Sequence, residues 1–141
     1  MKFKVNRKYH IPYIAGYNMS GSIIYIDSRL PKTLPGTSIK LEKYLLIHEL
    51  TEQHLEDHMA LSYPEAHAIA GAAELAAFDR DGHSKEQKSE YIKFYKQWEK
   101  LCRSTFDRIP ADLDLSPYVE SKDHELLKKM KQIEPAILVK G

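Results

Sequence analysis

The pattern of apolar and polar positions predicts a β-rich beginning to the chain. Residues 9–30 alternate short apolar runs with turn residues, and residues 22–27 (SIIYID) are rich in β-branched and aromatic side chains. A short apolar run at residues 13–15 and the turn sequence NMSG at residues 18–21 come just before them. These segments together predict an antiparallel β-hairpin.

Helical periodicity takes over after residues 31–36, where proline and glycine break the chain. Thr37 or Ser38 is the expected cap of the first helix. The segment 107–121 has the composition of a loop, with two prolines and several aspartates. The predicted helices cover about residues 39–61, 65–78, 84–106 and 122–132.

A hairpin followed by helices predicts an α+β fold, with a small N-terminal antiparallel hairpin or sheet packed on a mainly helical bundle. The length of 141 residues suits a single domain, residues 1–141. Within it we expect a core at about residues 9–80 and a helical C-terminal extension at about residues 84–141. The third helix should contribute an aromatic stripe to the core, namely Tyr91, Phe94, Tyr95, Trp98, Cys102 and Phe106.

Composition narrows the classes of partner. The formal net charge is +1, so no overall field attracts nucleic acid or anionic lipid. No apolar stretch approaches the roughly 20 residues that span a bilayer, so we expect no membrane partner. The first residues lack the apolar region of a secretory leader, and the single cysteine excludes an intramolecular disulfide. We therefore expect a cytoplasmic protein.

Two polar side chains interrupt the apolar stripe of the first predicted helix. The stripe consists of Leu41, Leu45, His48, Glu52, Leu55 and Met59, which share one face at about 100° per residue. His48 and Glu52 lie in its middle and should point inward. A buried carboxylate needs a cation, a proton or several donors. The i, i+4 spacing of the pair is the one by which a helix presents two ligands to one metal.

The second predicted helix repeats this combination, because His67, Gly71, Glu74 and Phe78 fall on one face. Two neighbouring helices thus each direct one histidine and one glutamate at their packing face. Clustered histidines and carboxylates are typical of metal sites. The alternative is a buried network in which the glutamates are hydrogen-bond partners of the histidines.

The segment HELTEQH, residues 48–54, begins like the zinc-binding motif HExxH. The glutamate after the first histidine of that motif is the general base, a role that Glu49 would take here. The position of the second histidine is occupied by Glu52, and His54 comes two residues later. We expect His54 and His58 to be surface residues on the flank of the helix.

The segments YIDSRLP, HELTE and AHAIAGAAE resemble the minimal zincin arrangement and short metallopeptidases encoded by phages and prophages. The resemblance covers roughly the first half of the chain. It implies His48 as a ligand, Glu49 as the base, Glu52 as the second ligand, and His67 or Glu74 as the third. If His67 is the third ligand, Glu74 either orients His67 by a hydrogen bond or is a fourth ligand. Zn²⁺ is the expected metal, with iron or manganese as alternatives because the site is rich in glutamate.

Two functions from different classes follow. The first is a zinc-dependent hydrolase, a peptidase whose peptide or protein substrate adds as a β-strand along residues 23–27. The second is a non-enzymatic phage or prophage protein, structural or host-interacting, with a structural metal or a buried His/Glu network. An open coordination position distinguishes a catalytic site from a closed structural one. A di-metal carboxylate bundle would require Glu-x-x-His motifs, which neither helix contains.

Overall fold

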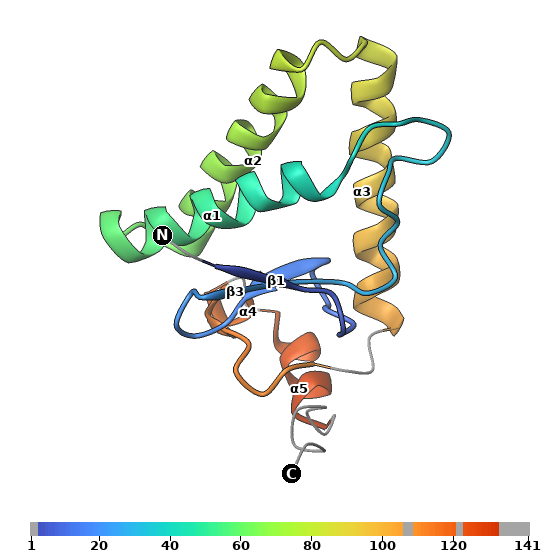
Figure 1. Ribbon diagram of the computed structural model, residues 1–141. Helices are drawn as coiled ribbons and strands as arrows, with labels where there is room; N and C mark the ends of the chain where they lie inside the picture. Colours follow the sequence, from blue (N-terminus) through green and yellow to red (C-terminus); the bar gives the residue numbers. More distant parts are fainter. Residues whose placement is uncertain (1–2, 106–108, 121–122, 133–141) are drawn as a thin grey trace. The chain divides into compact units, whose positions relative to one another are not determined.

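The computed structural model describes residues 3–105, 109–120 and 123–132 (Figure 1). It confirms the α+β class, with strands at the N-terminal end and helices after them. The chain divides into two compact units, which we call the sheet unit (Met1–Leu30 with Glu99–Gly141) and the helical unit (Pro31–Trp98). Among the described residues, no helix has the length and apolar character needed to cross a membrane. The elements are β1 (Lys4–Asn6), β2 (Ala15–Tyr17), β3 (Ile23–Ile26), α1 (Glu42–Met59), α2 (Tyr63–Arg80), α3 (Lys85–Thr105), α4 (Ser116–Glu120) and α5 (His124–Gln132).

The sheet has the strand order β1–β3–β2. β2 pairs antiparallel with β3, so the predicted hairpin is confirmed. β1 pairs parallel with β3 and was not predicted, because its three residues, KVN, have no clear alternation. β3 is therefore the central strand, with both of its edges already hydrogen-bonded. The prediction that a substrate strand adds along residues 23–27 is wrong, since β-addition needs an exposed edge.

The sheet unit has its own hydrophobic core. The cluster joins Tyr25 of β3 to Tyr118 of α4 and to Leu126 and Met130 of α5. The segment 107–121, which we expected to be a loop, thus contains the short helix α4. Burial of Tyr118 in this core stabilises that helix. The other buried members of the cluster are Ile11, Ile109 and Leu113.

The same unit contains a charged cluster of three residues, which we call the Asp123 clamp: Tyr13, Arg103 and Asp123. Arg103 donates two hydrogen bonds to the Asp123 carboxylate, at 2.7 and 3.1 Å. The Tyr13 hydroxyl donates to the same carboxylate at 2.7 Å. Burial raises the pKa of Asp123, but the hydrogen bonds from Arg103 and Tyr13 outweigh it and lower the pKa below its ordinary value.

In the helical unit, α1 and α2 form a helical hairpin (Figure 1). Ala60 ends α1 in the left-handed conformation, with φ of 55°. Ser62 then begins α2 with a capping box, in which its hydroxyl accepts from the Glu65 amide and the Glu65 carboxylate accepts from the Ser62 amide. The short connection fixes where the residues of α2 lie along α1.

The start of α1 differs from the prediction. The N-cap is Leu41, which makes no side-chain capping bond, so neither Thr37 nor Ser38 caps the helix. The Thr37 hydroxyl instead donates to the carbonyl of Leu34, at 2.8 Å, within a turn. A threonine hydroxyl can bond to a backbone group of its own turn, and that bond competes with capping of a helix that begins several residues later.

Burial follows the predicted stripes in part. The N-cap Leu41 and, within α1, Leu45 and Glu52 are buried, whereas Met59, the last residue of α1, is 60% exposed. In α3, Tyr91 and Cys102 are buried, and the aromatic side chains between them are half-buried. Phe106 lies outside the described residues. Burial, followed by the charge of Asp27, raises the pKa of the Cys102 thiol to about 12.

Candidate metal centre

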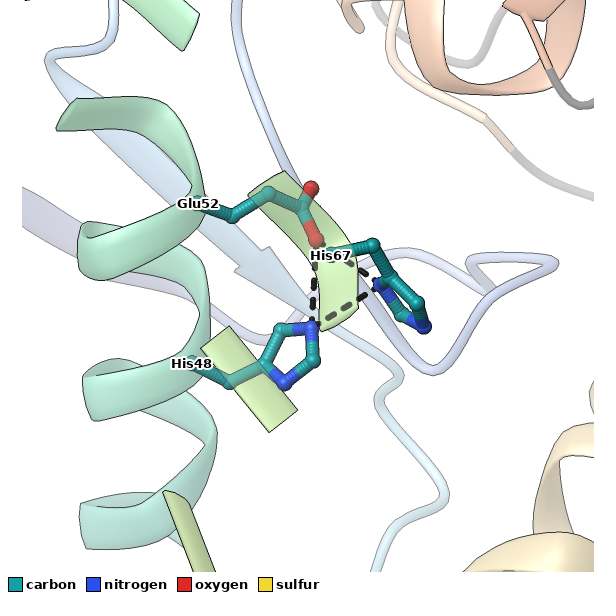
Figure 2. A group of neighbouring side chains, drawn as sticks. All are labelled: His48, Glu52 and His67. Carbon is teal, nitrogen blue, oxygen red and sulfur yellow. Dashed lines mark hydrogen bonds and ion pairs between the residues drawn. The ribbon is translucent and has the colours of Figure 1, made fainter. Parts of the chain in front are cut away.

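Three side chains from α1 and α2 converge on one point (Figure 2). The Nε2 atom of His48 lies 3.1 Å from Oε2 of Glu52 and 3.1 Å from Nδ1 of His67. The third side of this triangle, from His67 Nδ1 to Glu52 Oε2, measures 2.9 Å. We call these three atoms the ligand triangle. His48 and Glu52 come from successive turns of α1, and the capping box helps to place His67 opposite them.

Protons alone do not satisfy the ligand triangle. An imidazole nitrogen either carries a proton and donates or has a lone pair and accepts, and an ionised carboxylate only accepts. If both nitrogens donate to Glu52, the two N–H groups lie side by side, with their nitrogens 3.1 Å apart and no hydrogen bond between them. If one of them is deprotonated, its lone pair faces the other nitrogen or the carboxylate oxygen. With Glu52 ionised, at most two of the three contacts are hydrogen bonds, whereas one cation accepts lone pairs from all three atoms.

The size of the triangle suits a metal ion. Bonds of roughly 2.0–2.2 Å place tetrahedral ligand atoms about 3.3–3.5 Å apart and neighbouring octahedral ones about 3.0 Å apart. The observed separations of 2.9–3.1 Å match the octahedral spacing, whereas tetrahedral ligand atoms would have to lie up to about 0.6 Å further apart. Two imidazoles and one carboxylate are also the ligand types of several catalytic zinc sites.

Exposure changes sharply across the triangle. The Glu52 side chain is 4% exposed and that of His48 is 12% exposed, but that of His67 is 52% exposed. The two members of the triangle on α1 are therefore mostly buried, and the member on α2 is exposed. Solvent or a small ligand has access to the side on which His67 lies.

The pKa values of His48 and Glu52, the two buried members of the triangle, shift in opposite directions. Burial lowers the pKa of His48, but hydrogen bonds to Glu52 and Glu74 outweigh it and raise the pKa to about 10. Burial raises the pKa of Glu52, but hydrogen bonds from His48 and His67 outweigh it and lower the pKa below its ordinary value. Without a metal, the cluster thus holds a proton on His48 as its positive charge.

Glu74 lies outside the ligand triangle. Its Oε1 atom is 2.8 Å from Nδ1 of His48, on the opposite side of the imidazole from Glu52. Its Oε2 atom accepts a hydrogen bond from the Tyr91 hydroxyl of α3. Glu74 therefore pairs with His48 and not with His67, so the alternative in which it orients His67 is wrong. The sequence predicts the face on which Glu74 lies, but not which histidine of the facing pair it reaches.

Glu49 is buried, with 7% exposure, although it follows His48 by only one position. It is not one of the residues whose ligand atoms converge, which are His48, Glu52 and His67. Burial, and then the charge of Glu52, raises the pKa of Glu49 above its ordinary value, against the opposing effect of His48. A carboxyl that is shielded from water and close to the ligands has the environment of a general base.

Two tyrosines complete the surroundings and were not assigned to the site from the sequence. The Tyr63 hydroxyl lies 3.1 Å from Nδ1 of His67, and the two ring centroids are 5.2 Å apart. The i, i+4 spacing of Tyr63 and His67 was a usable signal. Tyr91 was expected only as a core aromatic, because spacing within α3 does not reveal a partner on α2.

The flanking histidines of α1 are surface residues, as expected. His54 and His58 are both exposed, and their ring centroids are 5.0 Å apart. Neither belongs to the ligand triangle. They form a second imidazole pair that any metal-binding measurement must separate from the first.

No family model, curated protein or solved structure matches the chain. Within the described residues, His48, Glu52 and His67 form a group that could hold a metal ion. Glu49 is the next residue after His48 on α1, and Glu74 contacts the other ring nitrogen of His48.

Proposed function

We propose that the protein is a metal-dependent hydrolase that uses His48, Glu52 and His67 as ligands. The observation that carries the proposal is the ligand triangle, whose three mutual contacts no arrangement of protons satisfies while Glu52 is ionised. Zinc is the first choice because the ligand set matches catalytic zinc sites. Iron or manganese is the alternative, since two histidines and a carboxylate also suit those metals.

A divalent cation at the triangle supplies Lewis acidity, which polarises a carbonyl group and lowers the pKa of water. His48 and His67 contribute neutral nitrogen lone pairs, and Glu52 contributes the negative charge. Glu49 accepts a proton from the attacking water and returns it to the leaving group. The raised pKa of Glu49 suits this exchange, because a base works best when its pKa lies near the working pH.

Exposure of His67 favours a catalytic site over a structural one. A structural zinc site is closed by four protein ligands, whereas a catalytic site has three and keeps one position open. The triangle supplies three ligands, and its third member is 52% exposed. Peptides are the proposed substrates because HELTE resembles the peptidase motif HExxH, with Glu52 in place of the second histidine.

Metal content is the first test. Protein purified without a metal-affinity tag should contain about one divalent ion per chain by elemental analysis. Glu52→Gln should lose it, since an amide is a poor anionic ligand. The double variant His54→Ala/His58→Ala should keep it, because that exposed pair lies outside the triangle. Zinc that disappears with the exposed pair instead of with Glu52 would refute the proposed centre.

Turnover is the second test. Glu49→Gln keeps the shape of the side chain and removes the proton acceptor, so it should keep the metal and lose activity by roughly 100-fold or more. The matched control is Asp57→Asn, which makes the same change from carboxylate to amide at an exposed position of α1 and should keep both the metal and the activity. If the wild-type protein binds metal but cleaves nothing in a broad peptide library, the non-enzymatic alternative with a structural metal is the better explanation.

A further inference from the structure

Three helices contribute to the environment of one ring nitrogen. The Tyr91 hydroxyl of α3 donates to Oε2 of Glu74 on α2, and Oε1 of the same carboxylate lies 2.8 Å from Nδ1 of His48 on α1. We call this chain the Tyr91 relay. Tyr91 is 1% exposed and the Glu74 side chain is 15% exposed, so bulk water has little access to replace either bond.

The relay determines how His48 carries its proton when a metal is bound. An ionised carboxylate only accepts hydrogen bonds, so Nδ1 of His48 must be the donor to Glu74. A neutral imidazole has one N–H, so that proton on Nδ1 leaves the lone pair on Nε2. Nε2 is the His48 atom in the ligand triangle. Tyr91 uses the second oxygen of Glu74 and thereby fixes the rotation of the carboxylate.

We propose that Tyr91 and Glu74 are positioning residues that hold His48 in the tautomer and orientation in which Nε2 binds the metal. Partners of this kind, which hydrogen-bond to metal-ligating histidines, typically change metal affinity by about 10–100-fold. His67 presents Nδ1 to the triangle, so the two histidines should bind through different ring nitrogens. The inference rests on the proposed metal centre and adds the residues that tune it.

Zinc affinity in competition with a chelator tests the relay. Tyr91→Phe and Glu74→Gln should weaken zinc binding about 10–100-fold. Tyr44→Phe is the matched control, because Tyr44 is also buried in the helical unit and donates its hydroxyl to a carboxylate, that of Asp81. Tyr44→Phe should lower the melting temperature without changing zinc affinity. Tyr91→Phe keeps the ring and its packing, so it decides the matter if Glu74→Gln does not fold.

Nitrogen NMR of the zinc-loaded protein gives a readout that a purely structural role would not change. In the wild type, one zinc-bound histidine should carry its proton on Nδ1 and the other on Nε2. In Glu74→Gln, the Nδ1 proton should exchange faster with water, since the charge-assisted bond that protects it is gone. Affinity and exchange unchanged in both variants, with zinc still bound, would overturn the relay alone. A wild-type protein that binds no zinc would overturn the metal centre and the relay together.

Discussion

The two units each contain a buried or half-buried polar cluster, and the clusters differ in where their positive charge comes from. In the Asp123 clamp, Arg103 is the cation, and its two hydrogen bonds with that of Tyr13 satisfy the carboxylate. In the ligand triangle no arginine or lysine takes part, and one carboxylate contacts two imidazole nitrogens that also contact each other. The protons of Arg103 and Tyr13 satisfy every contact of the clamp, whereas no arrangement of protons satisfies all three contacts of the triangle while Glu52 is ionised.

The difference separates a structural polar cluster from a binding site. A self-contained ion pair fixes the positions of its elements and has no remaining affinity for an ion. A cluster whose contacts conflict is stable only if something else supplies the charge, either a proton on His48 or an external cation. Burial of polar groups does not by itself indicate a function. A buried cluster whose donors and acceptors cannot all be satisfied by one another does indicate a binding site.

The largest expected effect is on stability in the presence of zinc. At a free zinc concentration one hundred times Kd, binding to the folded state alone adds about 2.7 kcal/mol to the free energy of unfolding. Thermal melts with zinc and with a chelator measure the difference. Arg103→Met should leave that difference unchanged and Glu52→Gln should remove it. Equal melting curves with zinc and chelator in the wild type would make the two clusters equivalent.

Changes of pH should affect His48 of the triangle and Asp123 of the clamp in opposite directions. In protein that a chelator keeps free of metal, the pKa of His48 is raised from 6.5 to about 10. The stabilising effect of protonated His48 is therefore complete below about pH 6.5 and is lost as the pH rises toward 10. The pKa of Asp123 is lowered from 3.8, so the clamp is stabilising above that value and weakens as the pH falls through the folded pKa. Melting temperatures across this range check both signs. A His48→Gln variant that keeps the alkaline loss would show that another group causes it.

Removal of the clamp cation should have a smaller effect than loss of the metal. Arg103→Met should cost about 1–2 kcal/mol, near the low end for hydrogen bonds to charged groups, because the Arg103 side chain is 40% exposed. Denaturant unfolding measures the cost. Zinc affinity should not change. A parallel loss of zinc binding would contradict the independence of the two clusters.

The smallest expected effect concerns the helix start that positions His67. Ser62→Ala removes one side of the capping box and should cost about 1 kcal/mol. If the cap matters only for stability, zinc affinity should not change, whereas full coupling of ~1 kcal/mol to binding would weaken it about fivefold, at ~1.4 kcal/mol for a tenfold change. Ser84→Ala, before the first turn of α3, is the matched control for loss of a serine hydroxyl at a helix start.

The sequence predicted the fold class, the β2–β3 hairpin and the helix faces on which His48, Glu52 and His67 lie, because each of these follows from a pattern that is local in the sequence. It did not predict β1, whose pairing partner lies about twenty residues away, or the central position of β3, which excludes strand addition. The partner of Glu74 was also misassigned. Periodicity places a residue on a face, but the rotation and offset of two packed helices decide which atoms meet.

Cys102 has a practical consequence for labelling chemistry. It is the sole cysteine, it is fully buried, and burial raises the pKa of its thiol to about 12. Thiol reagents attack thiolates, so the native chain should be almost unreactive toward maleimides while it is folded. A cysteine introduced at an exposed position such as Ala68, next to His67, would be the selectively modified thiol. A fluorophore attached there would report occupancy of the ligand triangle without removal of any native residue that contributes to it.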